Sequence, residues 1–199
     1  MTRSPDPGTF EHALKAVQVD ANSLFRLSAS PATEPWFARA GAGRFDDPQG
    51  LHGTARFGVL YAADSIETAF GESVIHENSL FRHGRFELPK GAAERRQLVA
   101  FQRPLPQLRL VDLCGPALKG LGLNADLLAG DDYAASQEWS AAIHQAVPRA
   151  DGLRYVRRQN PGGFCYAVFD RSDLARGSFV ELPPALIDQL CAAFNSVRV

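Results

Sequence analysis

Three polar residues within apolar segments are the first candidates for chemistry in this sequence. Arg26 lies in Leu24–Ser28 (LFRLS), whose alternation of apolar and polar residues predicts a half-buried strand. Tyr61 lies in the apolar run Gly58–Ala63 (GVLYAA), which predicts a central strand, and Glu72 lies in the helix expected after it. An arginine directed into a pocket binds phosphate through its planar set of donors. The residues alone also allow an edge strand with Arg26 in solvent and a helix with Glu72 exposed.

A glycine-rich segment, Ala40–Gly53 (AGAGRFDDPQGLHG), is the second candidate. Its glycines let the backbone approach a ligand closely, and Arg44 supplies a cation. Burying the carboxylate of Glu72 at a helix–sheet boundary is costly without a partner, which Arg26 or Arg44 would provide. His52 is either a hydrogen-bond donor beside the ligand or a surface histidine. The segment lacks the glycine spacing of Rossmann and Walker loops.

The segment DDYAASQEW, residues 131–139, is the third candidate. It opens a helix expected over Tyr133–Val147, with Ser136 in the first turns. The competing interpretation is structural, with Asp131 or Asp132 capping the helix and Trp139 in the core.

The surrounding patterns predict a single domain of the α+β class. A loose tail (1–8) and a short leading helix (Phe10–Val17) make up an N-terminal segment, residues 1–22, ahead of the main domain, residues 23–199. The expected elements of the main domain are strands at 24–28, 58–63, 98–102, 108–113, 152–156 and 164–169, a long ordered loop at 30–53, and helices at about 65–76, 115–131 (with a loop), 133–147 and 182–194. The sequence NPGG at 160–163 predicts a hairpin turn between the last two strands.

Composition excludes several functional classes. A net charge of −1 provides no strong field toward nucleic acid or membrane, which argues against a nuclease. No apolar run reaches membrane-spanning length, and residues 1–8 lack the apolar core of a signal peptide. The three cysteines, Cys114, Cys165 and Cys191, are widely spaced and fit reduced thiols rather than a metal site. We therefore expect a soluble, cytoplasmic protein without a metal.

At these residues the sequence resembles the RES-domain family, the toxin components of bacterial toxin–antitoxin pairs. The resemblance extends over about residues 24–170 and depends on five segments that occur in the family's order and spacing. These segments are LFRLS, AGAGRFDDP, GVLYAADSIETAFGES, DDYAASQEW and DGLRYVRRQNPGGFCYAVFD.

The resemblance implies a fold like the catalytic domain of ADP-ribosyltransferase toxins, with small central sheets flanked by helices. It also implies consumption of NAD as a substrate by cleavage of the nicotinamide–ribose bond. Water, phosphate and a target protein all remain open as acceptors of ADP-ribose. The family's Arg, Tyr and Glu correspond to Arg26, Tyr61 and Glu72, with Arg44 added from the glycine-rich segment.

The implied chemistry suits these residue types. Glu72 would stabilise the oxocarbenium-like ribose or orient its hydroxyls and the acceptor. Arg26 and Arg44 would hold the pyrophosphate, and Tyr61 would stack against nicotinamide or hydrogen-bond to it. Nicotinamide departs without a metal.

The sequence departs from the family at one position. Where family members often carry a serine, this chain has Arg157, so Ser136 is the substitute candidate for the NAD-binding set, together with His52. In place of the serine's role, Arg157 would add another contact to phosphate or select a different acceptor of ADP-ribose.

The resemblance also implies a cognate antitoxin, expected to be a helix-turn-helix DNA-binding protein that obstructs the pocket. The alternative to an enzyme is a non-catalytic nucleotide-binding or interaction module with the same fold.

Overall fold

In the computed structural model, which describes residues 4–156 and 162–199, strands β3 and β9 form the centre of a large sheet. Each neighbouring pair of strands in this sheet is antiparallel except β7 and β8. The strand order is β1 (Ala16–Asp20), β7 (Gln107–Leu113), β8 (Gly152–Val156), β9 (Phe164–Phe169), β3 (Val59–Ala63), β2 (Phe25–Ser28), β6 (Gln97–Gln102) and β10 (Ala175–Glu181).

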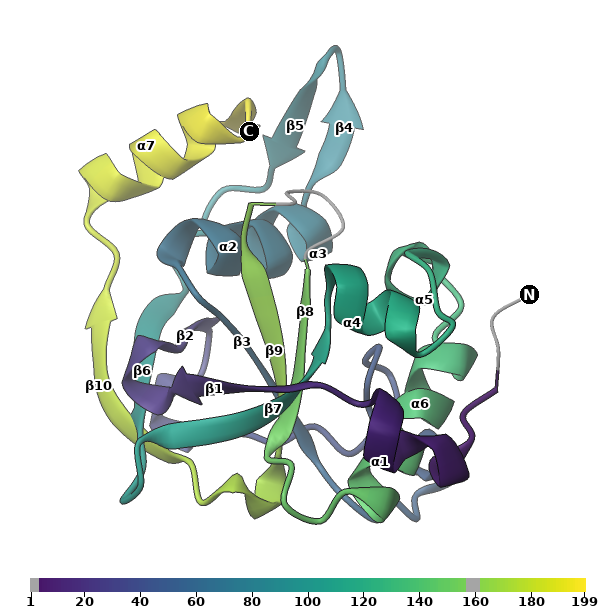
Figure 1. Cartoon of the computed structure of the whole chain (residues 1–199). Coiled ribbons are helices and arrows are strands. Elements are labelled where there is room, and N and C mark those ends of the chain that lie inside the picture. The colour runs from purple at the N-terminus through teal and green to yellow at the C-terminus, as the bar shows by residue number, and fades with distance from the viewer. Residues whose placement is uncertain (1–3, 157–161) are drawn as a thin grey trace.

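A second, three-stranded sheet and seven α-helices complete the described fold (Figure 1). The small sheet has the order β11 (Ser196–Arg198), β5 (Arg85–Leu88) and β4 (Leu80–Arg82). The helices are α1 (Phe10–Ala13), α2 (Ile66–Phe70), α3 (His76–Asn78), α4 (Gly115–Gly120), α5 (Asp126–Ala129), α6 (Ala134–Ala146) and α7 (Pro184–Ala193). None of the helices in the described ranges is long and apolar enough to cross a bilayer.

Shorter helical turns complete the connections. A π-helical turn, η5 (Gly71–Ile75), joins α2 to α3. The 3₁₀ turns are η1 (Pro7–Thr9), η2 (Ala21–Ser23), η3 (Pro31–Thr33), η4 (Pro48–His52) and η6 (Asp170–Ser172).

Two groups of helices pack on different parts of the large sheet, each around its own apolar cluster. Trp139 and Ile143 of α6 pack into a cluster that includes Leu153 of β8. Phe70 at the end of α2 belongs to a second cluster, which includes Ile187 of α7. Figure 1 shows α1, α4, α5 and α6 together on one side of the molecule, and α7 with the β4–β5 hairpin at another end. Residues of the central strands β3 and β9 line a cavity that lies between these two groups of helices.

The sheet also curls on itself. Leu110 of β7 and Val99 of β6, which belong to strands far apart in the sheet order, share a third buried cluster with Leu60 of β3 and Val168 of β9. Apolar residues on this face are thereby buried by other strands of the same sheet.

The sequence-based prediction of an α+β domain with helices flanking its sheets is confirmed. The six predicted strands and the four helices of the main domain are present with shifted ends. Strands β8 and β9 pair as the hairpin signal predicted, while residues 160–161 of the predicted NPGG turn lie outside the described residues. Ser65 caps the helix that carries Glu72, because its Oγ accepts a hydrogen bond from the Thr68 N–H at 3.1 Å.

Two expectations need correction. The leading helix ends at Ala13, and Val17 lies in β1 opposite Leu110, because Ala16–Asp20 forms five ladder pairs at the edge of the sheet. Part of the N-terminal segment is therefore a strand of the main sheet. The large sheet also holds eight strands rather than being small, since β1 and β10 extend it. The sequence did not indicate β10 because its residues are mostly exposed and do not alternate.

His144 on α6 makes the stability of this fold depend on pH. Its ring stacks on Phe57 at 4.2 Å and meets the edge of Phe169 at 5.0 Å. Burial, aided by the charge of Arg171, lowers the pKa of His144 from 6.5 to about 4. Between these pH values the unfolded chain binds the proton and the folded chain does not, so stability falls as pH falls from 6.5 to 4.

Substituting His144→Phe keeps the aromatic contacts and removes the titration. Urea unfolding at pH 4, 5, 6 and 7 should give a shallower loss of stability for this variant than for the wild type. An equal pH slope in the two proteins would contradict this origin of the acid sensitivity.

Candidate functional site

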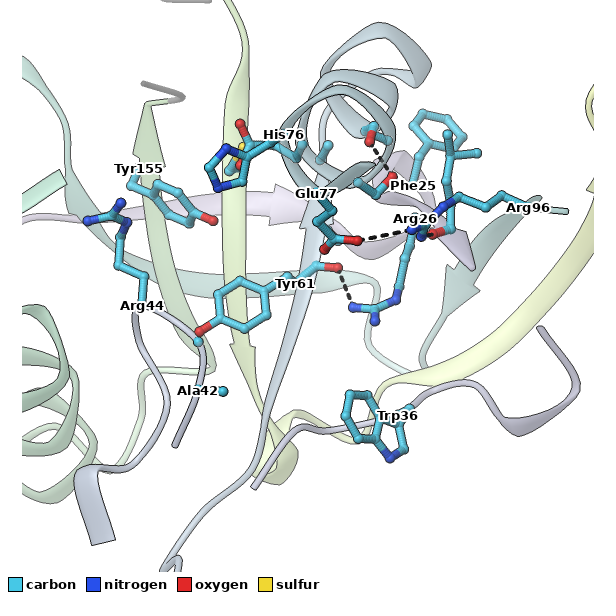
Figure 2. A pocket seen from close by; sticks show the side chains of 18 of the residues that line it. Phe25, Arg26, Trp36, Ala42, Arg44, Tyr61, His76, Glu77, Arg96 and Tyr155 are labelled. Carbon is cyan, nitrogen blue, oxygen red and sulfur yellow. Dashed lines mark hydrogen bonds and ion pairs between the residues drawn. The ribbon is translucent and has the colours of Figure 1, made fainter. Parts of the chain in front are cut away.

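A cavity of about 430 Å³ lies between the central strands, the α2–α3 helical segment and the glycine-rich loop. Arg26, Arg44, Tyr61 and Glu72 all line it. This volume falls in the range of small-molecule sites. Figure 2 shows Tyr61 between Arg44 and Tyr155 on one side and Arg26 on the other. The structure thus brings together four of the residues singled out from the sequence.

One face of the α2–α3 segment forms a wall of the cavity. Ala69, Glu72, Ser73, His76 and Glu77 line it, and their spacing of three and four residues is that of one helical face. Glu72 is partly buried and belongs to the π-helical turn η5. Such turns are often found at functional sites because they shift side chains away from the regular α-helical position.

Arg26 enters the cavity from an interior strand, since β2 pairs with both β3 and β6. The alternative of an edge strand with Arg26 in solvent is therefore wrong. Its Nη1 donates to the Tyr61 carbonyl at 2.9 Å, and its Nε lies 2.9 Å from Oε1 of Glu34. The carboxylate that pairs with Arg26 is thus Glu34 and not Glu72.

Arg44 is held at the opposite side of Tyr61 by backbone and aromatic contacts. Its Nη1 donates to the carbonyls of Gly130 at 2.9 Å and Leu127 at 3.4 Å. The guanidinium carbon lies 4.4 Å from the centre of the Tyr133 ring. Among the described residues, no carboxylate forms an ion pair with Arg44, so its charge is available to an anion in the cavity.

The Tyr61 hydroxyl is fully engaged with the glycine-rich loop. It donates to Oδ1 of Asp46 at 2.9 Å and accepts from the Phe45 N–H at 2.8 Å. Oδ2 of Asp46 accepts from the Gly43 N–H at 2.9 Å. Burial and then the neighbouring Asp46 charge raise the pKa of Tyr61 well above 10. The ring of Tyr61, rather than its hydroxyl, is therefore the part that remains to line the cavity.

Burial raises the pKa of Asp46, although the Gly43 N–H and the Tyr61 hydroxyl both favour its charged form. This residue is 1% exposed. It therefore serves to fix the loop against Tyr61 and is too enclosed to meet a ligand.

The adjacent Asp47 anchors the other half of the loop. It is fully buried, and its oxygens accept from Nε and Nη2 of Arg56 at 2.9 and 2.7 Å. Burial alone would raise the pKa of Asp47, but the hydrogen bonds and charge of Arg56 hold it below the usual value. A further hydrogen bond from the Gln49 N–H, at 3.1 Å, starts the 3₁₀ turn η4.

Helix α6 supports the loop from behind. Nε2 of Gln137 donates to the carbonyls of Gly41 and Gly43 at 2.8 and 2.9 Å, and Oγ of Ser140 donates to the Phe45 carbonyl at 2.7 Å. The loop is thus positioned by Gln137 of the DDYAASQEW segment and by Ser140, which directly follows it, and neither was among the site residues chosen from the sequence.

The structure does not place the two remaining candidates in the cavity. His52 is exposed at the end of η4, and Ser136 is buried with its Oγ donating to the Tyr133 carbonyl at 3.0 Å. Neither lines the cavity. Arg157 lies outside the described residues.

Several lining residues were missed from the sequence. They are Trp36, His76, Glu77, Arg96, Tyr133 and Tyr155. His76 follows Glu72 by four residues, so the helical period was a usable signal. Arg96 and Trp36 carried none, because they reach the cavity only through tertiary packing. In the described ranges, no three metal-ligating side chains gather into a possible metal site.

Comparisons with known proteins identify relatives of the sequence and of the fold. A model of the RES domain matches residues 23–186. The fold is similar to that in the crystal structure of the M. tuberculosis MbcT–MbcA toxin–antitoxin complex, with a TM-score of 0.63. That match has 19% identity and covers 94% of this chain and 96% of that chain. Curated protein sequences give no significant match.

The packing around Gly43 makes a direct test of the loop geometry possible. A Cβ at this position would lie 2.5 Å from the Tyr61 hydroxyl oxygen and 2.6 Å from Oδ1 of Asp46. Gly43→Ala should therefore separate the loop from Tyr61 and lower the free energy of unfolding by about 1–3 kcal/mol.

Gly120→Ala is the matched control, since the nearest atom to its Cβ would be 3.9 Å away in an exposed helix. It should change stability by no more than about 1 kcal/mol. Chemical denaturation measures both variants, and equal stability of Gly43→Ala and wild type would refute the tight contact.

Proposed function

This chain belongs to the RES-domain family, and from that membership we propose that it cleaves the nicotinamide–ribose bond of NAD. The observation that carries the proposal is the position of Glu72, which lines one cavity together with Arg26 and Arg44. A dinucleotide has an anionic pyrophosphate and develops positive charge at the reacting ribose. A cavity with both arginines and a carboxylate complements that distribution of charge.

In the proposed reaction, the bond between ribose C1′ and the pyridinium nitrogen breaks. The bonding electron pair leaves with nicotinamide, which becomes neutral, and positive charge builds at C1′ and the ring oxygen. The Glu72 carboxylate stabilises this charge or orients the ribose hydroxyls and the acceptor. The acceptor oxygen then bonds to C1′ and releases its proton.

The arginines divide the remaining binding work. Arg44 has only backbone carbonyls and the Tyr133 ring as described partners, so it keeps its full charge for a phosphate oxygen. Arg26 is fixed by Tyr61 and Glu34 and presents the rest of its guanidinium to the cavity. Fixed donors cost little reorganisation when substrate binds.

The tyrosines fit an aromatic leaving group. Since the Tyr61 hydroxyl is committed to the loop, the ring face stacks against nicotinamide in this proposal, and the hydrogen-bonding alternative is set aside. Tyr155 packs behind it against Phe45, with ring centres 4.9 Å apart.

We further propose that the protein acts as a toxin neutralised by a cognate antitoxin. The similar fold of MbcT comes from a complex described as toxin–antitoxin, and uncontrolled NAD loss would harm the host. A helix-turn-helix partner that obstructs the cavity remains the expected type. Water, phosphate and a target protein remain the candidate acceptors.

The second candidate function is a non-catalytic nucleotide-binding module with the same cavity. The arginines and the tyrosines serve this role equally well, so Glu72 is the residue that separates the two. In a binding module the Glu72 carboxylate would only hydrogen-bond to the ribose hydroxyls, so its loss would weaken binding, whereas in the enzyme its loss lowers the rate of nicotinamide release.

Glu72→Gln removes the charge and keeps the shape of the side chain. It should lower kcat for nicotinamide release from NAD on the order of 10²–10³-fold while leaving ADP-ribose binding within about threefold. Glu67→Gln, an exposed position on the same helix outside the cavity, should retain wild-type kcat. Equal rates for Glu72→Gln and wild type would exclude the assigned role.

The antitoxin proposal has its own test. Induction of the wild-type chain in a bacterial host should lower cellular NAD and arrest growth, and co-expression of the product of the adjacent gene should prevent both. Glu72→Gln should be tolerated alone. Growth arrest that persists with the adjacent gene product would contradict neutralisation by that partner.

A further inference from the structure

Trp36 lies at the rim of the cavity. It lines the cavity and is 54% exposed, so a large aromatic ring is accessible there to a ligand that enters from solvent. We propose that Trp36 is a stacking platform for the adenine base, so that the site selects the dinucleotide over nicotinamide mononucleotide. This inference rests on the proposed function and names the substrate group at the open end of that site.

Glu34 couples the platform to a phosphate-binding residue. This carboxylate is 7% exposed, its Oε1 lies 2.9 Å from Nε of Arg26, and its Oε2 accepts from the Trp36 N–H at 2.8 Å. One buried side chain therefore sets the distance between the guanidinium and the start of the Trp36 side chain. The base and the phosphate of an adenylate are separated by a single ribose, so an aromatic platform and a phosphate-binding residue that share one carboxylate partner suit such a ligand.

The difference in burial between Tyr155 and Trp36 indicates which end of the dinucleotide lies at which end of the cavity. Tyr155 is 8% exposed and lines the cavity together with Glu72, and burial, followed by the Cys165 and Glu72 charges, raises its pKa well above 10, so the reacting ribose and nicotinamide belong at this enclosed end. Figure 2 shows Trp36 and Arg26 on the opposite side of Tyr61 from Tyr155. The base that does not react thus occupies the end that remains open to solvent.

The charges at the open end also favour an uncharged group. Besides Arg26, which is assigned to the pyrophosphate, the cavity lining at this end includes Arg96, whose Nη2 pairs with Oε2 of Glu77 at 3.0 Å. Arg96 therefore already has a carboxylate partner. A neutral base over Trp36 needs no further cation, and stacking provides its binding energy.

Intrinsic fluorescence gives a direct test with ADP-ribose as the probe. The chain has two tryptophans, and the other, Trp139, is 2% exposed and packs on Phe10 outside the cavity. ADP-ribose should quench the emission of the wild type, and Trp36→Phe should abolish the quenching. Ribose 5-phosphate, which lacks a base, should leave the emission unchanged.

Calorimetry then measures affinity without the fluorophore. Trp36→Ala should weaken ADP-ribose binding about 5- to 150-fold, whereas Trp36→Phe should retain most of the affinity because it keeps an aromatic face. Phe179→Ala, a half-exposed aromatic position outside the cavity, is the matched control and should bind like the wild type. Thermal denaturation verifies that each variant is folded.

Turnover separates this inference from the proposed function. Trp36→Ala should raise KM for NAD by the same factor, keep kcat within about threefold, and leave kcat/KM for nicotinamide mononucleotide unchanged. Unaltered ADP-ribose affinity in Trp36→Ala, with NAD still cleaved by the wild type, would overturn the platform and leave the function standing. Tryptophan-dependent binding of ADP-ribose without any NAD cleavage would support the platform and refute the function. Failure of the wild type to bind ADP-ribose would overturn the platform.

Discussion

The hydrogen bonds between Asp46, the Tyr61 hydroxyl and the Gly43 N–H are the interaction on which the site depends. The glycine-rich loop has little regular structure of its own, so its shape must come from side chains. Asp46 supplies that shape by joining the loop to Tyr61 on the central strand β3. Asp47 fixes the second half of the loop through its ion pair with Arg56. Removing the Tyr61 hydroxyl or the Arg56 side chain would leave a buried carboxylate with backbone N–H donors alone, which is why such contacts define one loop conformation.

The position of the loop then decides what the cavity can bind. With Phe45 and Gly43 fixed on Tyr61, Arg44 reaches across to the carbonyl of Gly130 and keeps its charge toward the cavity. The Tyr61 carbonyl on the same strand accepts a hydrogen bond from Arg26. The positions of both arginines therefore depend on Tyr61. The hydroxyl and the carbonyl of Tyr61 thus hold the site together, and its ring remains available to a ligand.

The sequence predicted the fold class and the central site because both depend on local periodicity. Alternation in LFRLS and GVLYAA placed Arg26 and Tyr61 on strands, and the helical period after Ser65 placed Glu72 on a wall of the same cavity. The sequence did not predict that Trp36 and Arg96 line the cavity, because only the tertiary packing of distant segments brings these residues to the site.

Ser136 and His52 illustrate the opposite error. Both lie in segments that shape the cavity, yet Ser136 donates its hydroxyl to the Tyr133 carbonyl and His52 is exposed near the end of the loop. The functional contribution of the Ser136 helix comes instead from Gln137 and Ser140, whose contacts with the loop could not be read from spacing. Residue type and local period locate a segment, whereas long-range hydrogen bonds decide which of its side chains matter.

The central claim is that this cavity breaks the nicotinamide–ribose bond. Proton NMR of NAD incubated with the purified wild-type chain, in separate samples with water alone, with phosphate and with cell lysate, tests it most directly. The account predicts free nicotinamide in at least one sample, with an equal amount of ADP-ribose in hydrolysed, phosphorylated or protein-bound form. NAD that remains intact in all three samples would contradict it.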